Sequence, residues 1–161
     1  MNKSGFTLIE LLVAVGILLL LVGLGLANYI SFNDRQALIQ GAEQVREAMA
    51  DAQNSARSGK LRGCGQLQSY QVTFGNSVTI QSVCAPGGGT SESARSFALP
   101  SGVMASGSTL YIAPLRGLVF DNQTLIDGAS FHDITLENSY GSVVVTVTRS
   151  GAVTMSEITK N

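Results

Sequence analysis

The sequence has little of the chemistry on which most enzymes and metal sites depend. Its 161 residues include no Trp, one His, two Cys and three Pro. Two thiols and one imidazole do not supply the ligand set of a zinc site. His132, beside Asp133, has no Gly-x-Ser-x-Gly or Cys/His signature to accompany it, and we expect it in a loop or at a strand edge. The sequence therefore predicts no enzyme, no catalytic residue, no metal and no cofactor.

Charge is scarce and nearly balanced. The formal net charge is -1 and 13% of the residues are charged, so the whole chain favours neither nucleic acid nor anionic lipid. The 18 glycines and the few aromatic residues suit short strands joined by tight turns and argue against a helical bundle.

The longest gap in the charge pattern lies near the N-terminus. No charged residue occurs between Glu10 and Asp34, and about 20 apolar residues suffice for a helix to cross a bilayer. A secretory signal peptide is the competing interpretation, but its small-residue cleavage site follows a shorter apolar core, whereas Gly5 precedes this one. Lys3 is the only charge before Glu10 and favours a cytoplasmic N-terminus. We predict one transmembrane helix, with the chain beyond it outside the cytoplasm.

Residues 3–10 have the sequence Lys-Ser-Gly-Phe-Thr-Leu-Ile-Glu. This stretch resembles the class III signal of type IV pilins and type II secretion pseudopilins. In that family a prepilin peptidase cuts after the Gly and N-methylates the new terminal Phe. The resemblance implies cleavage between Gly5 and Phe6, methylation of Phe6, and a mature chain in which Glu10 is the fifth residue.

Glu10 is a carboxylate in an otherwise apolar segment, and its burial in lipid costs a few kcal/mol or more. The resemblance implies that Glu10 meets the terminal amine of a neighbouring subunit in a filament, here that of Phe6. An opposite charge at close range makes such a buried charge tolerable. The alternative is that Glu10 snorkels to the lipid headgroups. The two arrangements are compatible if snorkelling precedes assembly and pairing follows it.

The helix is predicted to continue beyond the membrane segment to about residue 58. Apolar residues recur there at spacings of four and three, which places them on one narrow stripe: Leu38, Ala42, Val45, Met49, Ala52 and Ala56. Gly59, close to the cations Arg57 and Lys60, is a suitable C-terminal end. A short coiled coil is the competing interpretation of the stripe.

After residue 59 the apolar period changes to two, which indicates strands. Residues 70–74 and 77–81 predict a hairpin with a two-residue turn at Gly75 and Asn76. Cys64 and Cys84 flank this hairpin on the oxidising side of the membrane, so we predict a disulfide. By closing a loop of about 20 residues it would contribute roughly 3 kcal/mol. Two free thiols are the alternative.

A second hairpin is predicted at the C-terminus, from residues 142–149 and 152–158 with a turn at Ser150 and Gly151. Val143, Val145 and Val147 should line one face of its first strand. The weaker strand predictions are residues 96–99, 109–112, 117–120 and 133–136, with 101–108 as a connection.

The predicted architecture is α+β and pilin-like, with one long N-terminal helix packed on an antiparallel β-sheet. It divides into a leader (1–5), a transmembrane and filament-core helix (6–30), an amphipathic continuation (31–59) and a sheet domain (60–161).

The C-terminal region resembles that of the GspH/FimT group, which comprises minor pseudopilins of type II secretion and minor type IV pilins. The matching features are Phe120-Asp121, Gly128, Ile134-Thr135-Leu136, the alternation at 143–148 and Gly151. The resemblance implies a minor subunit that helps to initiate or cap a helical filament, for protein secretion or pilus biogenesis. Its implied partners are the prepilin peptidase, other pilins or pseudopilins and an inner-membrane assembly platform. The implied location is the cytoplasmic membrane, then a pilus or pseudopilus.

Arg57, Lys60 and Arg62 form the one local basic cluster, which we interpret first as a solvated helix end. The alternative is DNA contact by a DNA-binding or adhesive minor pilin, used in natural transformation or surface attachment. FimT-like proteins of that kind carry a basic Gly-Arg-x-Arg motif near the C-terminus. Here Gly151 is followed by no arginine and Arg149 stands alone before the turn, so nucleic acid is not favoured.

Overall fold

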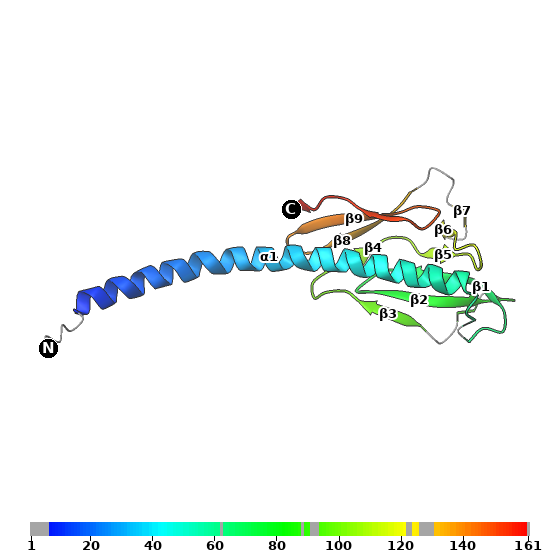
Figure 1. The fold of residues 1–161 in the computed structure, drawn as a ribbon, viewed down its shortest axis with the longest axis horizontal. Coiled ribbons are helices and arrows are strands. Elements are labelled where there is room, and N and C mark those ends of the chain that lie inside the picture. The colour runs from blue at the N-terminus through cyan, green and yellow to red at the C-terminus, as the bar shows by residue number, and fades with distance from the viewer. Residues whose placement is uncertain are drawn as a thin grey trace.

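A single long helix and two antiparallel sheets make up the computed structural model (Figure 1). It describes residues 7–61, 63–87, 89–90, 94–121, 124–125 and 131–160, with the backbone alone at 24–28, 121, 124 and 125. The helix, α1 (Leu8–Arg57), stands free along its N-terminal half and packs against the sheets along its C-terminal half. The predicted α+β arrangement is confirmed.

Helix α1 ends just before Gly59, as the sequence predicts. Gly59 has φ +63, in the left-handed region that glycine tolerates. The Lys60 N–H donates to the carbonyl of Ser55 and the Gly59 N–H to that of Ala56, both at 3.2 Å. These two bonds form a Schellman motif, which satisfies carbonyls that the last turn leaves unpaired.

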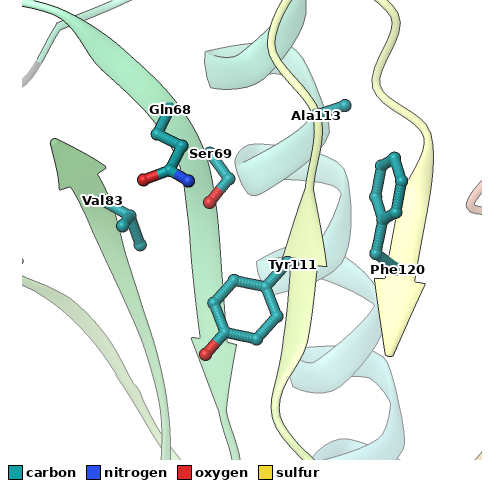
Figure 2. A pocket seen from close by; sticks show the side chains of 6 residues that line it. All are labelled: Gln68, Ser69, Val83, Tyr111, Ala113 and Phe120. Carbon is teal, nitrogen blue, oxygen red and sulfur yellow. The ribbon is translucent and has the colours of Figure 1, made fainter. Parts of the chain in front are cut away.

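The first sheet has six strands in the order β3-β2-β1-β5-β6-β7. They are β1 (Leu67–Thr73), β2 (Ser77–Cys84), β3 (Arg95–Ala98), β5 (Leu110–Ile112), β6 (Val119–Asp121) and β7 (Thr124–Leu125). One face of this sheet packs on α1, and the other carries Tyr111 and Phe120 at its surface (Figure 2).

The second sheet has the order β10-β9-β8-β4, and β11 also pairs with β9. Its strands are β4 (Met104–Ser106), β8 (His132–Glu137), β9 (Gly141–Val147), β10 (Val153–Met155) and β11 (Thr159–Lys160). Val143, Val145 and Val147 are buried, and the alternating burial along β9 confirms that they share one face, as predicted.

Three details of the sheet prediction are wrong. There are two sheets, because the connection predicted at 101–108 contains β4, which pairs with β8 and not with β5. The second strand of the C-terminal hairpin is split into β10 and β11. The first hairpin is joined by three residues, not two, and its register sets Val72 opposite Ile80. A two-residue turn would set Val72 opposite Thr79, which lies on the other face of β2.

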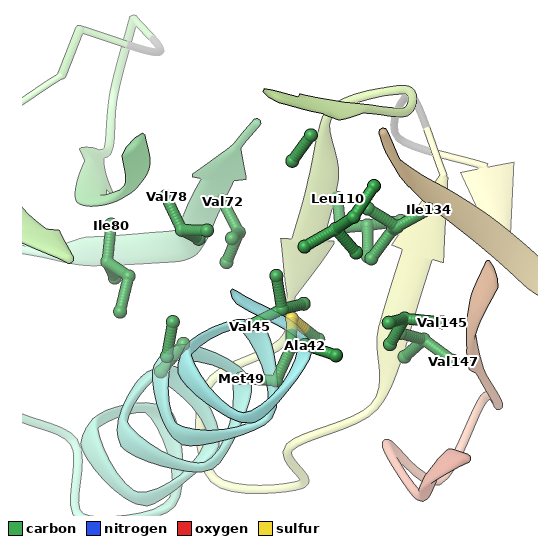
Figure 3. Packing of buried hydrophobic residues seen from close by; sticks show 14 of the residues in the cluster. Ala42, Val45, Met49, Val72, Val78, Ile80, Leu110, Ile134, Val145 and Val147 are labelled. Carbon is green, nitrogen blue, oxygen red and sulfur yellow. The ribbon is translucent and has the colours of Figure 1, made fainter. Parts of the chain in front are cut away.

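The core lies where α1 meets both sheets (Figure 3). All six residues of the predicted stripe are fully buried, from Leu38 to Ala56. They pack on the sheets of their own chain, so the stripe is not available for a coiled coil. The buried face is wider than predicted, because Ala48 and Ser55 are buried beside it.

Two contacts bring the sheets close to the start of the packed half. At Gly41 an added Cβ would lie 3.0 Å from Cδ2 of Leu136, so the absence of a side chain allows β8 to approach the helix. The turn between β8 and β9 reaches Asp34: Asn138 Nδ2 donates to its backbone carbonyl at 2.7 Å, and Ser139 Oγ donates to its carboxylate at 2.8 Å. These contacts fix the position at which the helix leaves the domain.

Candidate processing and assembly site

Thr7 and Glu10 form a capping box at the N-terminus of α1. One carboxylate oxygen of Glu10 accepts hydrogen bonds from the backbone N–H of Thr7 at 3.1 Å and from its hydroxyl at 3.0 Å. The Glu10 N–H in turn donates to the Thr7 hydroxyl oxygen at 3.4 Å. The box pairs donors that the first helical turn leaves free. It was not predicted above, although Thr-x-x-Glu before an apolar run is its sequence signal.

The capping box gives the Glu10 carboxylate a defined place at the start of the helix. A negative charge in the first turn also interacts favourably with the positive end of the helix dipole. Gly5 and Phe6, at the predicted cleavage and methylation site, lie outside the described residues. Pairing of Glu10 with the Phe6 amine of a neighbour therefore stays a prediction. Any such pairing has to compete with the Thr7 contacts or share the carboxylate with them.

Large apolar side chains cover the free half of α1 on every side, including Leu8 at 80% exposure and Leu20 at 71%. Contiguous apolar surface of this kind marks contact with a protein or a membrane. Within the part of the chain that the structure describes, no helix is long and apolar enough to cross a membrane. The predicted transmembrane segment at 6–30 includes residue 6 and the side chains of 24–28, which are not described.

Gly16 and Gly23 are positions in this apolar surface that carry no side chain. Within the described part of the chain, no heavy atom beyond the adjacent helix backbone lies within 4 Å of a Cβ added at either position. Their separation of seven residues places them on nearly the same side of the helix, two turns apart. Small residues in this arrangement let a second helix approach closely.

Cys64 and Cys84 form the predicted disulfide, with their Cα atoms 5.2 Å apart. The bond ties the segment after α1 to the end of β2. The same place is secured by the Ala85 N–H, which donates to the carbonyl of Gln66 at 2.9 Å. The disulfide therefore fixes the entrance of the chain into the first sheet.

The predicted basic cluster lies at the end of α1, where Arg57 and Lys60 are exposed and Arg62 falls outside the described residues. The structure adds Arg116, which the sequence reasoning did not include. Its neighbour Gly117 is so close to Arg57 that an added Cβ would lie 2.7 Å from the Arg57 Nε. No carboxylate among the described residues pairs with these cations. DNA contact at this end stays a prediction.

His132 is the first residue of β8, and its Nε2 lies 3.2 Å from the hydroxyl of Ser108. The adjacent Asp133 accepts a hydrogen bond from the Thr146 hydroxyl at 2.8 Å. Consecutive side chains of a strand point to opposite faces of the sheet, so His132 and Asp133 lie on different faces of β8. Among the described residues, no three His, Cys, Asp or Glu side chains are grouped so as to hold a metal ion.

Comparison with known families finds one match, at the N-terminus. A family model described as the prokaryotic N-terminal methylation motif matches residues 1–26. No curated protein and no solved structure matches the chain. The motif supports a type IV pilin-like protein, and it implies processing by a prepilin peptidase and assembly with other pilins.

Proposed function

We propose that this chain is a structural subunit of a type IV pilus or a type II secretion pseudopilus, and that it is not an enzyme. The observation that carries the proposal is the combination of two features in one segment. Residues 1–26 match the methylation motif, and the helix that begins at Leu8 presents apolar side chains that no described part of its own chain covers. A subunit of a helical filament needs both features, since its helix must reside first in lipid and then among other helices.

The mechanism has three steps. A prepilin peptidase removes residues 1–5 and methylates the amine of Phe6. The apolar half of α1 then anchors the subunit in the cytoplasmic membrane, with the sheets outside the cytoplasm. An assembly platform finally moves the helix into the filament. Lipid tails are as apolar as leucine, so helix packing in the filament depends on close contact, for which Gly16 and Gly23 leave room.

Glu10 sets the register of this packing by meeting the Phe6 amine of an adjacent subunit. In the isolated subunit its carboxylate is held by Thr7 and is not left unpaired. During assembly the charged amine supplies a stronger partner, because it adds the attraction of a full opposite charge, which the neutral Thr7 donors lack. We place the chain in the GspH/FimT group, as a minor subunit that initiates or caps the filament.

The test is the substitution Glu10→Leu in the organism's own filament system, with Glu47→Leu as the matched control. Glu47 is an exposed glutamate on the packed half of the same helix. We expect both variants to insert into the membrane and to be processed, as measured by membrane fractionation and by the mass of the mature N-terminus. Incorporation into sheared filaments should fall at least tenfold for Glu10→Leu only.

Two outcomes contradict different parts of the proposal. Normal incorporation of Glu10→Leu would refute the pairing of Glu10 with the amine. A wild-type chain that keeps residues 1–5 and an unmethylated N-terminus in the presence of an active prepilin peptidase would refute the filament-subunit function itself.

A further inference from the structure

A cavity of about 230 Å³ opens on the face of the first sheet that points away from α1 (Figure 2). It is lined by Gln68, Ser69, Val83, Tyr111, Ala113 and Phe120. Two of these are aromatic, three carry an amide or a hydroxyl group (Gln68, Ser69 and Tyr111), and none is charged. The sequence analysis assigned no role to any of them in binding.

An irregularity in β1 directs two consecutive polar residues into this cavity. Leu67 pairs with Cys84 and Ser69 pairs with Val83, so Gln68 is the extra residue of a β-bulge. In a regular strand, consecutive side chains point to opposite faces of the sheet. The bulge changes this alternation, and both Gln68 and Ser69 line the same cavity. Bulges often occur beside binding sites because they redirect a side chain in this way.

The bulge is held firmly on both sides. Cys84, opposite Leu67, is bonded to Cys64, and the Ala85 N–H donates to the Gln66 carbonyl at 2.9 Å. Val83 forms a further backbone bridge with Thr90 and is 5% exposed, so it makes an ordered wall. A site that is rigid before a ligand arrives loses little conformational entropy on binding.

The polar groups in the cavity are available to a ligand. Within the part of the chain that the structure describes, the side chains of Gln68, Ser69 and Tyr111 form no hydrogen bond. Tyr111 and Phe120 are directly opposite each other on β5 and β6, so their rings lie on adjacent strands of one face. The site thus offers aromatic surface next to unpaired amide and hydroxyl groups.

We propose that this cavity binds one ring of a neutral carbohydrate. A sugar ring has a face of C–H groups that packs on aromatic side chains, and hydroxyl groups that bond to amides and hydroxyls. An anionic or cationic ligand would find no opposite charge among the lining residues. A lipid chain would leave the amide of Gln68 and the hydroxyl of Ser69 without water or partner, which is unfavourable. The volume is below the 300–1,000 Å³ or so of drug-sized sites, as a site for a single ring requires.

The test measures glycoside binding to the full-length chain by ligand-observed saturation-transfer NMR, in a detergent without a sugar headgroup. The probes are the methyl glycosides of glucose, galactose, mannose and N-acetylglucosamine, with glucuronate as an anionic comparison. Tyr111→Ala and Gln68→Ala remove one aromatic ring and one amide. Gln81→Ala is the matched control, because Gln81 lies on β2 of the same sheet and does not line the cavity.

We expect at least one neutral glycoside to bind the wild type and Gln81→Ala equally, with a Kd of about 1 mM, or near -4 kcal/mol. Binding should weaken at least tenfold in Tyr111→Ala and in Gln68→Ala, both checked for folding by circular dichroism. A four-unit oligosaccharide of the same sugar is then compared with the single-ring glycoside. Tighter binding of the oligosaccharide would identify a surface glycan as the natural ligand, whereas equal affinity of the two would identify a free sugar. Absence of glycoside binding, equal binding by all variants, or tighter binding of glucuronate would overturn the proposal.

Discussion

The two halves of α1 have the same backbone conformation and opposite surroundings. At residues 8–23 and 29–32 the large apolar side chains are mostly more than half exposed, and they point in every direction. From Asp34 to Arg57 a stripe made largely of small residues is completely buried against two sheets, and charged residues occupy the other faces. One continuous helix of 50 residues therefore has an exposed apolar surface on all sides in its first half and a single buried stripe in its second half.

The difference shows that the surroundings of each half of the helix depend on how its apolar residues are distributed around the axis, more than on how many there are. A helix with one apolar stripe completes a core inside its own chain, whereas a helix that is apolar on all sides needs an apolar medium on all sides. The second half finds this medium in the sheets, whereas no described part of the chain supplies it to the first half. Removal of comparable side chains from the two halves should therefore have very different effects on folding.

The largest expected effect is that of Leu38→Ala, compared with Leu18→Ala in the free half. Leu38 is 0% exposed and Leu18 is 60% exposed. We expect Leu38→Ala to lower the free energy of unfolding by about 2–5 kcal/mol, through lost burial and a residual cavity. Leu18→Ala should change it by less than about 0.5 kcal/mol.

The measurement for this pair is urea unfolding of the full-length chain, followed by near-ultraviolet circular dichroism. Tyr70 is fully buried between the helix and the sheets, so the tyrosine signal reports on the packed half. Equal shifts in the two variants would show that the free half also belongs to the folding unit of the domain.

A smaller effect is expected from the double substitution Cys64→Ser and Cys84→Ser. The disulfide closes a loop with a sequence separation of 20, and its removal should cost about 3 kcal/mol in the chain-entropy model. The urea midpoint of the sheet domain should fall, whereas the helicity of the free half should stay the same. The reduced wild-type chain is the control and should match the variant. An unchanged midpoint in both would mean that the disulfide does not constrain the unfolded chain.

The smallest expected effect is that of Thr7→Ala at the start of the free half. Loss of the N-cap costs about 1 kcal/mol, which corresponds to roughly fivefold faster amide exchange in the first turn. Exchange in the buried stripe, which begins at Leu38, should not change. First-turn exchange at the wild-type rate would show that the Glu10 carboxylate alone is sufficient to hold the helix end.

Much of this fold could be predicted because the deciding information is local. The stripe of α1, its end at Gly59 and the alternation in β9 each follow from the spacing of residues within one segment. The disulfide also follows, since a hairpin necessarily brings its own flanks together. The turn between β1 and β2 could not be predicted from its residues, because the register depends on which face meets α1.

The remaining errors concern partners that are distant in the sequence. Residues 104–106 form a strand only because β8 is available beside them, and nothing in their own pattern distinguishes them from a loop. The bulge at Gln68 depends on how β1 meets Cys84, which a single-strand pattern does not contain. For this reason the processing motif was visible in the sequence, and the cavity on the outer sheet face was not.

The contacts at Asp34 have a mechanical consequence when the helix is pulled along its axis. A pull along α1 from the N-terminal side reaches the sheets first at this residue, where Asn138 and Ser139 hold the helix by two hydrogen bonds. The buried stripe that follows Asp34 runs along the same axis. The force therefore acts as shear on all the contacts between the stripe and the sheets together, and it does not break them one after another. Tension on the helix would thus be spread across both sheets before any strand is separated from its neighbour.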